Sequence, residues 1–132
     1  MINRRAILGA TAALGAVATL GLTAISATAG SVTGTFRGQS NHVTSGQVKI
    51  IKEDGRYFVE LGDDFSLDGG PDPRVAFGAD GTYDPDSKLG ALLSLTGKQR
   101  YAIPAPWDHT KYNEVYIWCD VAGVPLGVAS IK

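Results

Sequence analysis

The amino-acid sequence predicts an all-β protein, a single antiparallel β-sandwich or barrel of about eight strands preceded by a helical signal segment. Short segments of alternating or β-branched character recur at regular spacing after residue 30, and the turns between them are rich in Gly, Pro and Asp. No segment after residue 30 places apolar residues at a 3.6-residue period over the length of a helix.

Residues 1–29 have the parts of a secretion signal. A short positive start at Arg4 and Arg5 is followed by the uncharged residues 6–25, and Ala27-Thr28-Ala29 is a small-x-small cleavage site. The uncharged run is about long enough to span a bilayer, so an uncleaved anchor is the alternative. Because the run is only weakly hydrophobic and no stop-transfer charges follow it, we expect cleavage and no stable membrane span afterwards.

The start of this leader is similar to the twin-arginine export motif. Asn3-Arg4-Arg5-Ala6-Ile7-Leu8 has a polar residue, two arginines, any residue and two apolar residues. A general secretory signal that begins with two arginines remains the alternative route. By either route we expect an exported protein of the periplasm, the cell envelope or the extracellular space.

Residues 30–132 are long enough to form one domain with a workable core. The leader holds two of the 12 basic residues and none of the 13 acidic ones, so the remainder has a formal net charge of −3. No basic patch of the kind that binds nucleic acid is present, and no polybasic stretch for anionic lipid. Bulk charge therefore does not specify a partner, and the oligomeric state stays open.

Eight segments are predicted to be strands. They run over residues 31–37, 47–52, 57–61, 74–78, 90–95, 99–103, 114–120 and 126–131. Asp54-Gly55 between the second and third is a strong signal for a tight hairpin, and a turn at residues 121–125 joins the last two. Along residues 114–120, Val115, Ile117 and Cys119 fall on one face. Because both faces begin apolar, this strand is expected to be central and largely buried.

Cys119 is the single cysteine, so an intramolecular disulfide is impossible. Its thiol could ligate haem or another metal, or act as a redox group if a nearby charge lowers its pKa. The alternative, which the residues alone favour, is a small core side chain, because free Cys is among the most buried residue types. An unpaired thiol in an oxidising compartment is nevertheless prone to damage, which favours a functional role for Cys119.

His42 and His109 are the two histidines, and either imidazole could bind iron, copper or zinc. They lie 67 residues apart without close ligand spacing, so each is expected to be a surface or hydrogen-bonding residue. Two Asp-rich loops, at residues 63–72 and 80–86, could hold Ca²⁺. Neither matches an EF-hand, and Asp is common in ordinary turns.

Catalytic signatures are missing from the sequence. There is no Gly-x-Ser-x-Gly elbow, no His-Glu-x-x-His and no phosphate-binding loop around Gly97-Lys98. Dispersed acids of a hydrolase have no motif to support them. An electron-transfer or binding module is therefore favoured over a hydrolytic enzyme.

Residues 32–132 resemble the DM-thirteen domain, which occurs in Skeletor-type animal proteins and in many exported bacterial proteins. The matching blocks are Gly34-Thr35-Phe36, His42-Val43-Thr44-Ser45-Gly46-Gln47-Val48, Gly70-Pro71-Asp72-Pro73-Arg74-Val75, Leu95-Thr96-Gly97-Lys98-Gln99-Arg100-Tyr101-Ala102-Ile103-Pro104, Val115-Tyr116-Ile117-Trp118-Cys119 and Gly127-Val128-Ala129. The Ile-Trp-Cys piece is the most specific of them.

The resemblance implies a β-rich domain that transfers electrons through the signature cysteine, as a thiol or as a ligand of haem or a metal. Carried over, Cys119 is the leading redox or cofactor-binding residue, and Trp118 precedes it in the same block. His42 and Asp72 are the next candidates, as polar residues inside matching blocks. Members of the family often carry cytochrome modules, which this chain does not have, so we expect a separate redox partner protein. The other function left open is a non-catalytic ligand- or protein-binding domain of the cell envelope, with Cys119 in a structural role.

Overall fold

The computed structural model describes residues 32–132. The signal segment expected over residues 1–29 lies outside the described residues. The strands are β1 (Val32–Gly38), β2 (Thr44–Ser45), β3 (Gln47–Glu53), β4 (Arg56–Leu61), β5 (Ser66–Leu67), β6 (Pro73–Ala79), β7 (Thr82–Tyr83), β8 (Gly90–Ala91), β9 (Gln99–Ala102), β10 (Glu114–Cys119) and β11 (Val124–Ser130). Two single-turn 3₁₀ helices, η2 (Pro85–Ser87) and η3 (His109–Lys111), complete the described elements.

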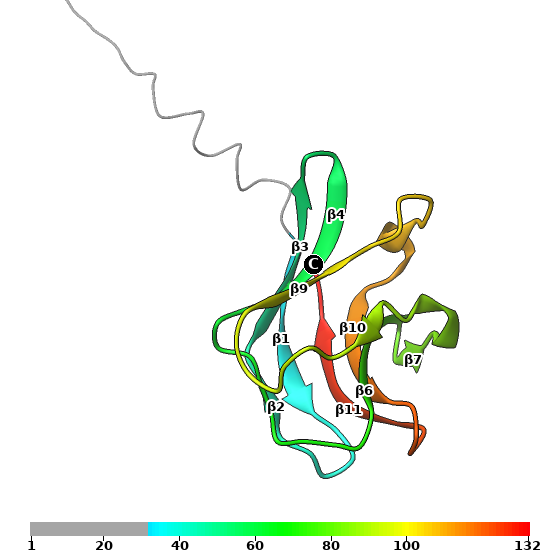
Figure 1. The fold of residues 1–132 in the computed structure, drawn as a ribbon. Coiled ribbons are helices and arrows are strands. Elements are labelled where there is room, and N and C mark those ends of the chain that lie inside the picture. The colour runs from blue at the N-terminus through cyan, green and yellow to red at the C-terminus, as the bar shows by residue number, and fades with distance from the viewer. Residues whose placement is uncertain (1–31) are drawn as a thin grey trace, which may run out of the picture. The chain divides into compact units, whose positions relative to one another are not determined.

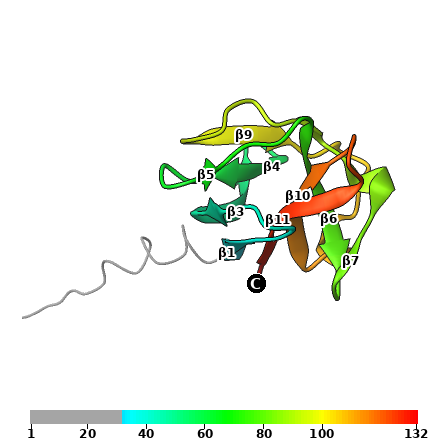
Figure 2. The same cartoon turned by 90° about the horizontal axis from the view of Figure 1, so that it is seen from below.

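One antiparallel sheet contains most of these strands and curls into a half-barrel (Figure 1). Its order is β7-β6-β10-β11-β1-β3-β4-β9, and β8 also pairs with β6. β1 joins the two halves, because Val32–Thr35 pairs with β3 while Phe36–Gly38 pairs with β11. Figure 2 shows the bend of the sheet from below, with β3, β4 and β9 on one side and β10, β6 and β7 on the other. The predicted all-β class is confirmed.

The strand predictions are correct for seven of the eight segments to within two residues at each end. The Asp54-Gly55 hairpin between β3 and β4 is confirmed, and both residues have positive φ, +52° and +80°. The prediction over residues 90–95 is wrong, since only Gly90 and Ala91 pair with β6. Beyond them, the Leu92 N–H donates to the Pro73 carbonyl at 2.8 Å and the Leu93 N–H donates to the Tyr101 hydroxyl at 2.9 Å, so backbone and side-chain groups both hold this segment without a continuous ladder.

The core fills the concave side of the curled sheet. Its apolar side chains come from both halves, with Val48, Ile50, Val59 and Leu61 on one half and Val75, Phe77, Val115 and Ile117 on the other. β10 lies between β6 and β11 and is buried along most of its length, as the sequence predicts. Within residues 32–132 no helix is long and apolar enough to cross a membrane.

Candidate functional site

Cys119 is the last residue of β10, and its side chain is fully buried, with 0% relative exposure. Its Cα partners in the neighbouring strands are Pro73 of β6 and Val124 of β11, neither of which has a polar side chain. The Cys119 carbonyl accepts a hydrogen bond from the Gly123 N–H at 2.8 Å, which closes the turn to β11. The thiol is therefore enclosed by the core at the end of the central strand.

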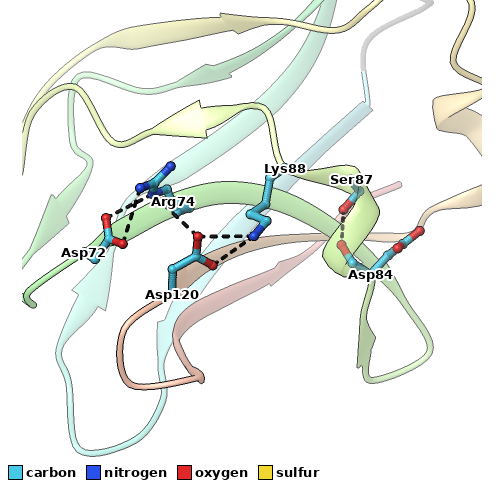
Figure 3. A network of polar contacts seen from close by, with 6 residues as sticks. All are labelled: Asp72, Arg74, Asp84, Ser87, Lys88 and Asp120. Carbon is cyan, nitrogen blue, oxygen red and sulfur yellow. Dashed lines mark hydrogen bonds and ion pairs between the residues drawn. The ribbon is translucent and has the colours of Figure 1, made fainter.

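A chain of ion pairs crosses the same end of β6 and β10 (Figure 3). Arg74 donates to both carboxylate oxygens of Asp72, at 3.0 and 3.3 Å, and its Nε lies 3.8 Å from Asp120. Lys88 Nζ lies 3.2 Å from each oxygen of Asp120. The Asp120 N–H also donates to the Asp72 carbonyl at 3.1 Å. These four side chains, which we call the corner network, tie together the strand ends that enclose Cys119.

Each charge in the corner network has an opposite partner. The hydrogen bonds and charge of Asp72 raise the pKa of Arg74 above its ordinary value, so the guanidinium stays charged. The four side chains are between about a quarter and two fifths exposed. Pairs at this exposure contribute little net stability, typically less than about 1 kcal/mol each. The network therefore acts mainly to fix the geometry of the corner.

Ser87 positions the Lys88 end of this network. Its side chain is fully buried, and its Oγ accepts from the Phe77 N–H at 2.8 Å. The same oxygen lies 2.6 Å from the Asp84 carbonyl, to which it can donate (Figure 3). The serine thus holds the 3₁₀ turn η2 against β6. Lys88, the next residue, is thereby directed toward Asp120.

Trp118 lies on the opposite face of β10 from Cys119, because side chains alternate along a strand. Its Cα partner on β6 is Arg74, which places the indole beside the corner network. The Tyr83 ring stacks on the indole with 3.8 Å between centroids and 6° between planes, and it meets Tyr116 edge-on at 5.8 Å. The outer face of β10 thus has three aromatic rings in contact.

Tyr83 is a site residue that the sequence analysis did not identify. It belongs to β7, which has two residues and therefore no periodicity to detect. A signal was available in Asp80-Gly81, whose positive φ values of +53° and +86° fold β7 back onto β6. In the sequence, that pair reads only as part of an acidic loop.

The Tyr83 hydroxyl is a buried polar group without a hydrogen-bond partner, the one such side-chain atom among the described residues. An unmade hydrogen bond of this kind costs roughly 1–3 kcal/mol of folding free energy. We therefore expect Tyr83→Phe to unfold at a higher urea concentration than the unaltered protein, with a gain of about 1 kcal/mol. Tyr112→Phe is the contrasting variant, since the Tyr112 hydroxyl donates to Asp84 at 2.5 Å. It should lose stability, and a gain equal to that of Tyr83→Phe would contradict the explanation.

Three tyrosines make stability sensitive to alkaline pH. Burial, reinforced by neighbouring carboxylates, raises the pKa of Tyr83, Tyr112 and Tyr116 to about 12 each. An unfolded tyrosine titrates near pH 10, so the folded state holds these protons more tightly. The stabilisation is complete below about pH 10 and is lost as pH rises toward 12. Tyrosinate absorbance at 295 nm should rise together with loss of the β circular-dichroism signal; tyrosinate formation well below pH 10 in folded protein would contradict this.

His42 has its side-chain hydrogen bond with Asp68 and not with the other three predicted residues. Its Nδ1 is 2.9 Å from the Asp68 carboxylate, which also accepts from the Val43 N–H at 3.0 Å. Both hydrogen bonds hold the pKa of Asp68 below its ordinary value, and the one from the Val43 N–H has the larger effect. No hydrogen bond or ion pair among the described residues joins His42 to Asp72, Trp118 or Cys119. The structure therefore brings together three of the four predicted residues.

The residues around Cys119 do not fit a haem or metal centre. The thiol is enclosed, and residues 32–132 contain no group of three or more His, Cys, Asp or Glu side chains arranged to hold a metal ion. His109 packs its ring against Tyr57, with 4.5 Å between centroids. In the two acidic loops, Asp64 accepts from the Gln47 N–H and Asp84 from the Asp86 N–H, so their carboxylates support turns.

Comparison with known proteins identifies the family. No curated protein and no solved structure matches the chain. Residues 35–131, almost the whole described region, match the family described as electron transfer DM13. The chain belongs to the electron transfer DM13 family.

Proposed function

We propose that this chain is an exported electron-transfer domain that passes single electrons between separate redox proteins at the Trp118 face of β10. The observation that carries the proposal is that Trp118 and Cys119 are consecutive residues of the central strand. The indole is half-buried on the outer face and the thiol fully buried in the core. The family supports the electron-transfer part. The leader at residues 1–29 supports export to the periplasm, cell envelope or extracellular space.

The two side chains differ in what a partner protein can reach. Without opening of the sheet, a partner can contact the stacked rings of Trp118 and Tyr83 but not the Cys119 sulfur. In this proposal the donor and the acceptor contact the stacked rings at the same time, so that the electron passes directly from one to the other across the rings, and the polarisable sulfur behind them remains a thiol. A reduced donor protein loses one electron and an oxidised acceptor gains one, so no side chain of this chain is left oxidised.

The burial of Cys119 also favours a second function, a non-catalytic ligand- or protein-binding domain of the cell envelope. A cysteine whose thiol is fully enclosed is typical of a structural residue in the core. Under this function the outer face of β10 still contacts a partner, but no electrons pass. The two functions therefore differ in electron exchange and agree in the surface used.

The first measurement is the ultraviolet–visible spectrum of protein exported through its own leader and purified gently. We expect no visible band, because the described residues do not fit a coloured centre. A Soret or charge-transfer band that disappears in Cys119→Ala would replace the proposal with a ligand role for Cys119. Detection of the protein in the cytoplasm with its leader intact would contradict export.

The decisive measurement is stopped-flow electron exchange with a reduced and an oxidised one-electron protein, such as a small cytochrome. Trp118→Leu should slow the exchange, and Cys119→Ala should slow it less. Trp107→Leu is the matched control, since Trp107 is also half-buried but packs elsewhere against the core. Equal rates in all variants, or no exchange by the unaltered protein, would leave the binding function.

A further inference from the structure

A groove lies on the outer face of the half-barrel, next to Trp118. Its volume is about 520 Å³, within the range of roughly 300–1,000 Å³ typical of small-molecule sites. β7 and β1 line it on either side, and β10 and β11 lie beneath it. The groove is separate from the enclosed thiol, which faces the other side of β10.

The register of the sheet places a cation and an aromatic ring in one row across this groove. Arg37 of β1 is the Cα partner of Val128, which is the Cα partner of Tyr116 on β10. The three side chains therefore point to the same face. Two strand spacings separate the arginine from the tyrosine backbone, about 10 Å. Trp118 lies two residues further along β10, at one end of the groove.

The groove is lined by one cation, Arg37, and one anion, Glu114. The Glu114 carboxylate accepts from the Gly81 N–H at 3.0 and 3.1 Å and from the Tyr116 hydroxyl at 3.2 Å. Arg37 is exposed and has no carboxylate partner among the described residues, in contrast to Arg74 and Arg100. A ligand with acceptor oxygens or a negative charge at one end would satisfy the guanidinium.

We propose that this groove binds a planar aromatic carrier of the quinone class, with its ring system toward Trp118 and its oxygens or anionic group toward Arg37. A ligand of two or three fused rings is about as long as the two strand spacings, about 10 Å, that separate the backbone of Arg37 on β1 from that of β10. Flat rings pack well on aromatic surfaces, which the half-buried rings of Trp118 and Tyr83 supply in this groove, whereas Tyr116 and Val128 are buried. The inference rests on the proposed function, since it makes such a carrier one of the two electron partners at the Trp118 face.

Titration calorimetry with anthraquinone-2-sulfonate tests the inference, and anthracene-2-sulfonate is the matched probe that cannot carry electrons. Both should bind the protein with similar affinity. Arg37→Gln should weaken both by about tenfold or more, the usual effect of losing a charge-assisted hydrogen bond. Arg56→Gln is the control, because Arg56 is also exposed but lies on β4, outside the groove.

The outcomes separate the inference from the proposed function. If both probes bind and Arg37→Gln weakens both, the groove is supported as a binding site. This holds whether or not a one-electron donor protein then reduces the quinone. Binding without reduction, measured with a donor protein whose reduction potential lies below that of the quinone, would sustain the site and remove the quinone as an electron partner. Absence of saturable binding at millimolar probe, or equal affinity in Arg37→Gln, overturns the inference, while Trp118-dependent exchange between proteins would still support the function.

Discussion

Folded protein is expected to protect Cys119 from a water-soluble disulfide reagent by a factor of about 10³ or more relative to protein in urea. The thiol has no exposed surface and lies on the central strand, so the reagent reaches it only when β10 or β11 separates from the sheet. An opening that costs 5 kcal/mol or more leaves roughly one molecule in several thousand open at any moment. Ellman's reagent at pH 8, followed with and without urea, measures the ratio.

Substitutions at Cys119 complete this prediction. Cys119→Ala should fold, with a loss of about 1–2 kcal/mol for the small volume removed from a packed core. Cys119→Asp should not fold, since the carboxylate would be buried with no basic partner at the thiol position. Rapid labelling of folded protein, or a stable Cys119→Asp, would show that the thiol is reachable. In that case direct thiol chemistry would become the better account of the family's electron transfer.

The alternation of residues along β10 is the part of the site that the sequence predicts most directly. Val115, Ile117 and Cys119 on one face of a central strand follow from the two-residue period and from both faces being apolar. Burial of Cys119 follows from the same pattern. What the pattern does not contain is the environment of each face, because that depends on which strands lie alongside.

Asp72 and Cys119 illustrate that the sequence pattern does not reveal which strands lie side by side. The two residues are 47 positions apart, and they become neighbours because β6 pairs with β10 in a register that sets Pro73 opposite Cys119. Periodicity indicates strands but not their partners, so only the family resemblance placed both residues in one candidate set. The same resemblance included His42, which the fold instead directs to Asp68.

Local hydrogen bonds explain the remaining errors. Residues 90–95 have the composition of a strand, yet the Gln99 side chain accepts from the Ser94 N–H and donates to the Ser94 carbonyl. A side chain that satisfies the backbone of Ser94 in this way interrupts strand pairing at that residue. Tyr83 was missed for the opposite reason, because a two-residue strand is defined by its partner and not by its own sequence.

Gly78→Ala is expected to separate the Tyr83 ring from Trp118 while the core of the half-barrel stays folded. Gly78 pairs with Tyr83 on one side and Glu114 on the other. A Cβ there would lie 2.4 Å from Tyr116 Cε1 and 2.5 Å from the Thr82 carbonyl oxygen, both closer than atoms can approach. Tyr116 is buried among its neighbours, whereas β7 is a two-residue edge strand. β7 should therefore move, and Tyr83 with it.

The cost of such overpacking is about 1–3 kcal/mol of unfolding free energy, which urea denaturation measures. Near-ultraviolet circular dichroism should show the loss of the signal of the stacked rings, and Tyr83→Leu provides the reference spectrum for that loss. Electron exchange at the Trp118 face should fall in both variants if the stacked pair is the contact point. An unchanged spectrum in Gly78→Ala would show that Tyr116 yields instead of β7. Unchanged exchange despite the lost stack would assign the contact to Trp118 alone, because the indole keeps its place on β10 whether or not Tyr83 covers it.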